Sequence, residues 1–162
     1  MLADAAENAR LSGRTDVADY LSLKATNDAV RRAGVQWLFD TVMELSGEAN
    51  RRGAAIAIER EDPHNFKFRN GNMAGSLLRL RYGVRCLTVE AGWTRTPNDG
   101  FMRGGALAAA KITHFGIPKA NTELVLHRPG ESPVWNVFLN EKSEREFHAP
   151  DLVEHSGSFS AD

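Results

Sequence analysis

Apolar residues change their spacing near Gly53, and this change constrains the fold more than any other feature of the chain. Before Gly53 they recur every three or four residues, which is the period of one face of an α-helix. After it, Ile56 and Ile58 alternate with Ala57 and Glu59, which is the period of a β-strand. We therefore predict an α+β fold in which the helical part comes first and the strands follow.

The helical segment begins near Thr15, a residue type that commonly caps a helix N-terminus. Its longer apolar stripe consists of Val30, Val35, Leu38, Val42 and Leu45. Thr26 or Asn27 could cap a second helix, and Gly34 could break or kink the segment. One long helix and two shorter helices therefore both fit the pattern.

Turn residues divide the second part of the chain into strands. Glu-Asp-Pro-His-Asn at residues 61–65 predicts a turn, so that residues 54–69 form a hairpin, and Asn-Gly-Asn at residues 70–72 predicts the next turn. Residues 76–92 are too long for a typical strand. A two-residue turn at Gly83-Val84 would fold them into another hairpin.

The turn at Gly83-Val84 also predicts a strand register. The apolar pairs that it creates on one face are Leu80–Leu87 and Leu78–Val89, and the pairs on the other face include Arg79–Thr88 and Arg81–Cys86. Shifting the turn by one residue would place Leu80 opposite Arg85 and mix the two faces. We therefore predict the register centred on Gly83-Val84.

Residues 104–116 are ambiguous. Their alanine content, with Gly116 at the end and Pro118 beyond it, favours a helix, whereas the Ile-Thr-His-Phe ending favours a strand. We predict a helix here and keep the strand as the alternative. Residues 124–127 and 134–139 are predicted to form a last hairpin.

Together these elements predict a single α+β domain over residues 1–162. One or two N-terminal helices would pack on a mostly antiparallel sheet of five to seven strands, with Trp37 and Trp135 in the core. The apolar face of that sheet is predicted to hold Ile56, Ile58, Phe66, Phe68, Leu78, Leu80, Leu87 and Val89. Residues 1–14 and 156–162 are polar, and we expect them to be poorly ordered.

Composition narrows the function classes. Apolar content of 42% and charged content of 25% are ordinary for a soluble domain, and no apolar run approaches the ~20 residues of a membrane span. No signal peptide is visible, and the single cysteine, Cys86, favours a cytoplasmic setting. The five histidines lack close ligand spacing, so we predict neither a metal site nor a cofactor.

Charge is concentrated in the middle of the chain. Residues 67–111 carry eight Lys and Arg residues against two acidic ones, a net charge of +6. The flanks, residues 1–66 and 112–162, sum to −3 and −4. Such a basic region can attract a small anion, a nucleic acid or an acidic protein surface.

The first candidate for that role is a basic strip on the predicted sheet, made of Lys67, Arg69, Arg79 and Arg81. It could contact phosphates, or it could be a solvated face on which Arg79 or Arg81 pairs with Glu59 or Glu90. Phe66 and Phe68 are predicted to point to the opposite face, which argues against base stacking beside the strip.

The second candidate is the loop from Thr94 to Gly105, which we rank as the foremost functional site. Arg95 and Arg103 flank its turn residues, and Trp93 precedes it. Arg103, Gly104 and Gly105 at a helix start would present backbone N–H groups to an anion. The alternative is a surface loop whose glycines only turn the chain, because no phosphate-loop fingerprint is present.

A catalytic set is harder to find. Glu90, Cys86 and His114 are the only residues that we consider, with Glu90 or His114 as a general base. Three functions follow as hypotheses. They are a binding module for an anionic partner, a small enzyme that holds an anionic substrate with Arg95 and Arg103, and a homo-oligomeric interaction protein.

Overall fold

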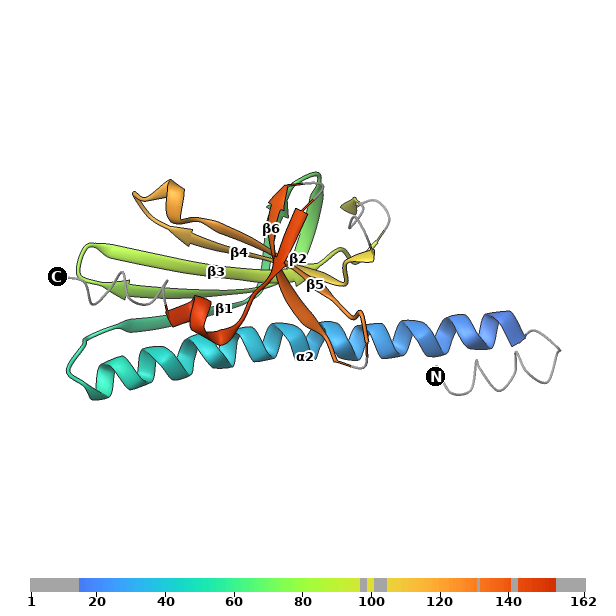
Figure 1. Cartoon of the computed structure of the whole chain (residues 1–162), viewed down its shortest axis with the longest axis horizontal. Coiled ribbons are helices and arrows are strands. Elements are labelled where there is room, and N and C mark those ends of the chain that lie inside the picture. Colours follow the sequence, from blue (N-terminus) through green and yellow to red (C-terminus); the bar gives the residue numbers. More distant parts are fainter. Residues whose placement is uncertain (1–14, 97–98, 101–104, 131, 141–142, 154–162) are drawn as a thin grey trace.

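The computed structural model describes residues 15–96, 99–100, 105–130, 132–140 and 143–153. Within this range one long helix lies against an antiparallel sheet of seven strands, whose order in space follows their order in the chain (Figure 1). The α+β prediction is confirmed, and the N-terminal part is one helix. The elements are α2 (Thr15–Arg51), β1 (Ala57–Phe68), β2 (Gly71–Tyr82), β3 (Arg85–Trp93), β4 (Ala108–His114), the 3-10 turn η3 (Pro118–Ala120), β5 (Thr122–His127), β6 (Val134–Asn140) and β7 (Ser143–Glu146).

The main core lies between α2 and one face of the sheet, which we call the helix face. From α2 it receives Val35, Leu38, Phe39 and Val42, of which Leu38 and Phe39 are fully buried. The helix-face residues of the strands include Leu78, Leu80, Leu87, Val89, Ile112, Leu124, Leu126, Trp135 and Val137. The N-terminal part of α2 extends beyond the strands (Figure 1).

Of the two tryptophans predicted for the core, Trp135 is buried and Trp37 is not. The Trp37 side chain is 41% exposed and lines a cavity beside Leu126 and Trp135 rather than entering the main core. Gly34 neither breaks nor ends the helix. A Cβ on Gly34 would lie 2.6 Å from Leu126 Cδ2. The carbonyl oxygen of Gly34 accepts a hydrogen bond from Trp135 Nε1 at 3.0 Å. Glycine at this position therefore serves close packing of helix on sheet.

The predicted hairpin over residues 54–69 is wrong, because β1 runs through its supposed turn. A β-bulge between Glu61 and His64 sets two residues of β1 against one of β2. The extra residue reverses the alternation, so Phe66 pairs with Met73. Phe66 and Phe68 therefore leave the helix face and join a small second core on the opposite, outer face of the sheet.

The hairpin at Gly83-Val84 is confirmed in the predicted register. Leu80 lies opposite Leu87, and Arg79 lies opposite Thr88. Gly83 has φ +61°, the left-handed value that the first position of such a turn requires. Nothing else approaches a side chain built at this position, so backbone conformation alone selects glycine here.

Gly83→Val should lower the free energy of unfolding by about 1–3 kcal/mol, because a β-branched residue is strained at positive φ. Urea denaturation of the variant measures this loss. Val84→Ala is a matched control in the same turn, since Val84 is almost fully exposed. It should change stability by less than ~0.5 kcal/mol. A Gly83→Val protein as stable as the parent would contradict the strained-turn explanation.

The predicted helix over residues 104–116 is also wrong. Residues 108–114 form β4, a central strand that pairs with β3 on one side and with β5 on the other. Ala108, Ala109 and Ala110 are completely buried, since the helix-face core covers one side of β4 and the second core covers the other. Two ladders of hydrogen bonds and burial on both faces outweigh the helix propensity of alanine. The hairpin predicted at 124–127 and 134–139 is confirmed as β5 and β6.

In the described part of the chain, α2 is the one long helix, and it is too polar to cross a membrane. Residues 1–14 and 156–162, which we expected to be poorly ordered, lie outside the described residues.

Candidate functional site: a cationic cavity between α2 and the end of β3

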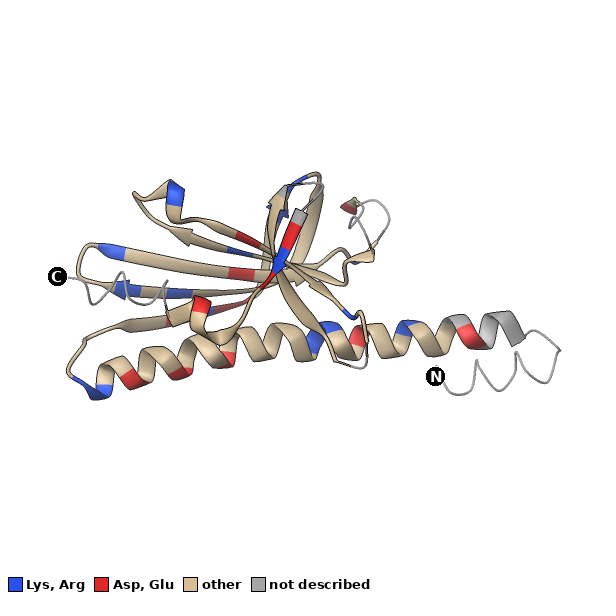
Figure 2. Cartoon of the chain, viewed as in Figure 1, with Lys and Arg blue, Asp and Glu red and all other residues tan. Residues whose placement is uncertain are grey.

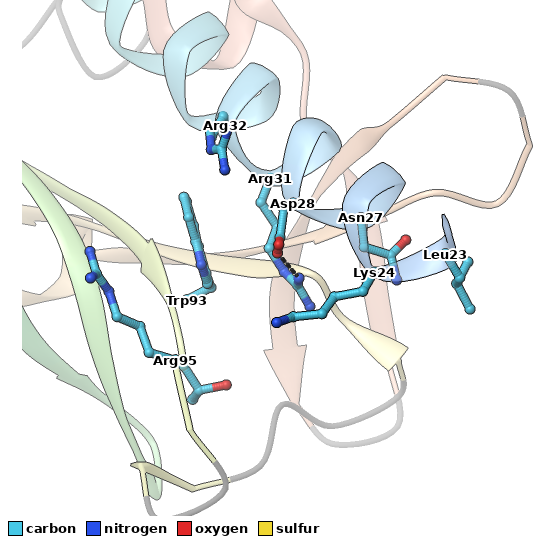
Figure 3. Close-up of a pocket in the computed structure, with 9 residues that line it drawn as sticks. Leu23, Lys24, Asn27, Asp28, Arg31, Arg32, Trp93 and Arg95 are labelled. Carbon is cyan, nitrogen blue, oxygen red and sulfur yellow. Dashed lines mark hydrogen bonds and ion pairs between the residues drawn. The ribbon is translucent and has the colours of Figure 1, made fainter. Parts of the chain in front are cut away.

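A cavity of about 540 Å³ lies where the N-terminal part of α2 passes the end of β3. Its lining comes from α2, from the last residue of β3 and from the two residues that follow: Leu23, Lys24, Asn27, Asp28, Arg31, Arg32, Trp93, Thr94 and Arg95 (Figure 3). The α2 residues are spaced by three or four positions, so they share one face of the helix.

Positive charge dominates the lining. Lys24, Arg31, Arg32 and Arg95 stand against a single carboxylate, Asp28. Asp28 already accepts a hydrogen bond from Arg31 Nη1 at 2.8 Å, and Arg31 Nε donates to the Leu107 carbonyl oxygen at 2.8 Å. The half-buried Arg31 is therefore held in place, and Asp28 is already engaged in pairing with it.

The other three cations of the cavity are exposed. Within the described residues, Lys24, Arg32 and Arg95 have no carboxylate within ion-pair distance. Like charges gathered without counter-charges raise the local positive potential and attract anions. The Arg31 guanidinium, fixed on two of its nitrogens, would meet such an anion at little entropic cost.

Trp93 gives the cavity an aromatic wall. The side chain is half-buried and packs against the main core on one side. In Figure 3 its indole ring stands between Arg95 and the α2 residues Arg31 and Arg32. An aromatic ring beside guanidinium groups can also stack on a planar ligand.

The structure describes only some residues of the loop that we predicted as a functional site. Arg95 lines the cavity. Arg103 and Gly104 lie outside the described residues, and Gly105 is exposed with φ +72°. Sequence reasoning missed the contribution of α2. The 3/4 spacing of Lys24, Arg31 and Asn27 was visible, but nothing in it indicated that this face meets the end of β3.

The predicted basic strip does not form one uninterrupted cationic surface. Arg79 Nη1 lies 3.2 Å from Glu59 and 3.6 Å from Glu61 on the outer face, and Arg81 is exposed. The bulge turns Lys67 to the other side of the sheet from Arg79. Arg69 pairs with Glu123 at 3.0 Å. Figure 2 shows acidic positions close to basic ones along the strands.

The bulge also overturns one point made against base stacking. Phe66 and Phe68 share the outer face with Arg79, contrary to the prediction. They are nevertheless buried, with 8% and 7% exposure, so their rings are covered by the second core. A base could not stack on them without opening that core.

The candidate catalytic set does not come together. Glu90 and Cys86 lie on the outer face, whereas His114 lies opposite Leu87 on the helix face. His114 is buried, and this burial lowers its pKa, which favours the neutral ring at pH 7. Neither Glu90 nor His114 lines the cationic cavity.

Glu90 instead contacts a histidine that sequence reasoning did not connect with it. Its Oε2 lies 2.7 Å from His64 Nε2, and Glu61 lies 3.9 Å from His64 Nδ1. His64 reaches Glu90 across β2 because its partner there is Gly75, which has no side chain in the way. The sequence did not predict the bulge that brings His64 to this face. The contact between His64 and Glu90 could therefore not be predicted either.

A second cavity of about 290 Å³ lies between α2, the start of β6 and the residues that follow β7. Trp37, Pro133, Trp135 and Phe147 contribute to a mostly apolar lining, with Glu146 and His148 also present. The residues that line this second cavity include no lysine or arginine.

No family model matches this chain, and comparisons with curated proteins and with solved structures find no match either. Among the described residues, His, Cys, Asp and Glu side chains form no group of three suited to a metal ion.

Proposed function

We propose that this chain is a binding protein for a small anionic ligand, held in the cationic cavity between α2 and the end of β3. The observation that carries the proposal is the charge of the lining, which holds four cations and a single carboxylate that is itself paired with Arg31. The volume of about 540 Å³ lies within the range of small-molecule sites.

The pairing of charges on the outer face of the sheet favours a small anion over a long polyanion as the ligand. A nucleic acid needs a continuous basic track, and its affinity comes mainly from many phosphate contacts. Here Arg79 and Arg69 are paired with glutamates. Binding of a nucleic acid or an acidic protein surface, an enzymatic reaction at Arg95 and Arg103, and homo-oligomer formation remain alternative hypotheses.

The proposal predicts that pyrophosphate binds at low ionic strength and that Lys24→Ala with Arg95→Ala abolishes most of this binding. Each lost charge-assisted contact should weaken affinity by about 10-fold or more. Isothermal titration calorimetry measures the affinity, and amide chemical shifts of Thr94 and Asn27 locate the ion. Raising the salt concentration should weaken binding, since salt screens exposed charges.

The matched control removes two exposed cations elsewhere, Lys119 and Arg128. The Lys119→Ala, Arg128→Ala protein has the same net charge as the cavity double variant but an intact cavity lining. It should bind pyrophosphate as the parent does. Equal losses in both double variants would mean that only the overall charge matters, and the cavity proposal would be wrong.

A further inference from the structure

The cationic cavity carries a second kind of chemistry besides charge. Trp93 forms one wall, and Leu23 of α2 also contributes apolar surface. An inorganic anion uses only the cations and gains nothing from an aromatic wall. A ligand with a planar ring would use both, because stacking on tryptophan favours flat, polarisable groups.

Two polar groups lie in the same lining. The Asn27 side-chain amide can donate and accept hydrogen bonds, and the Thr94 hydroxyl can do the same. Such paired donor and acceptor groups suit the edge of a heterocycle or the hydroxyls of a sugar. The lining therefore offers cations for a phosphate, an aromatic wall for a ring and neutral polar groups for the part between them.

We infer that the ligand is a nucleoside phosphate, with its base against Trp93 and its phosphate at Lys24 and Arg31, while Arg95 on the other side of the indole ring adds to the positive potential. This inference rests on the proposed function, since it names the anion that the cavity binds. The cavity volume of about 540 Å³ admits a single nucleotide. On the opposite, outer face of the sheet, Arg69 and Arg79 are paired with glutamates, so the described residues of that face form no continuous cationic track for a longer strand.

The test compares four probes by titration calorimetry: AMP, ribose 5-phosphate, adenosine and a deoxyadenosine tetranucleotide. AMP should bind about 10-fold tighter than ribose 5-phosphate, because only AMP adds base stacking. Adenosine should bind more weakly than AMP, because it lacks the phosphate. The tetranucleotide should bind no tighter than AMP. A tetranucleotide preferred by 10-fold or more would overturn the inference in favour of a single-stranded nucleic acid.

Two substitutions of Trp93 separate stacking from packing. Trp93→Phe keeps an aromatic ring and should retain most of the advantage of AMP over ribose 5-phosphate. Trp93→Leu should remove that advantage while ribose 5-phosphate still binds. Because Trp93 also contacts the main core, thermal melts must show that each variant is folded before its affinity is compared.

The two proposals fail in different ways. If ribose 5-phosphate and AMP bind equally well and both depend on Lys24 and Arg95, the nucleoside assignment is wrong and anion binding stands. If none of the phosphate probes binds, or if the Lys24→Ala, Arg95→Ala double variant binds them as tightly as the parent does, the proposed function is wrong. The nucleoside phosphate inference is then wrong as well.

Discussion

Gly75→Ala should destabilise the protein by about 3 kcal/mol or more, at the upper end of overpacking effects. Gly75 of β2 lies opposite Gly92 of β3, and the two backbones approach so closely that neither position has room for a side chain. A Cβ on Gly75 would collide with the Ala91 carbonyl oxygen and lie 2.6 Å from Gly92 Cα. Backbone atoms within a paired strand cannot move aside as a flexible side chain can, so the strands themselves would have to separate.

The same change should disturb the candidate site. Trp93 directly follows Gly92, and Thr94 and Arg95 come next, so a shift of β3 would move one wall of the cationic cavity. Urea denaturation measures the loss of stability, and pyrophosphate titration measures the effect on the site. Gly130→Ala is the control, since a Cβ there meets nothing within 4 Å. A Gly75→Ala protein within 1 kcal/mol of the parent would show that β2 and β3 can separate at little cost.

The parts of the fold that could be predicted depend on local pattern. The register around Gly83-Val84 followed from two apolar pairs and one glycine, because a slip by one residue would reverse both faces. The helical character of the N-terminal part followed from the spacing of residues such as Leu38 and Val42, although one long helix and two shorter helices fitted that spacing equally well. In both cases the residues that decide the structure are close in the chain.

The failures came from tertiary context. The bulge at Glu61–His64 reverses the faces of the second half of β1, and the Pro63 that predicted a turn lies within it. In β4, the run Ala108–Ala110 reads as helix when taken alone. It is a strand because its small side chains fit between the main core and the second core. The local sequence does not indicate that both faces of this segment are covered.

In the candidate site, too, the residues marked by a local pattern could be predicted and those brought in by tertiary structure could not. Arg95 could be identified because it borders a loop with many turn residues. Lys24, Arg31 and Arg32 are about 60–70 positions earlier in the chain, and they reach the cavity only because α2 continues past Gly34 and beyond the strands. A helix broken at Gly34 would have left these cations without a defined place.

Leu38→Ala should therefore affect both stability and binding, because Leu38 helps to fix α2 on the sheet. The side chain is fully buried in the main core, between Val35 and Val42 on the packed side of the helix. Removing it should leave a cavity and lower the free energy of unfolding by about 2–5 kcal/mol. Under conditions where the variant is folded, pyrophosphate should bind more weakly, since the α2 side of the cationic cavity would be held less firmly.

Leu23→Ala is the matched control for stability, with the same substitution in the same helix. Leu23 is 59% exposed, so its loss should change the free energy of unfolding by less than about 1 kcal/mol. Denaturant melts of the two variants side by side give the difference directly. Equal and small losses would mean that α2 is not packed on the sheet as described. The cationic cavity would then lose the wall that supplies most of its charge.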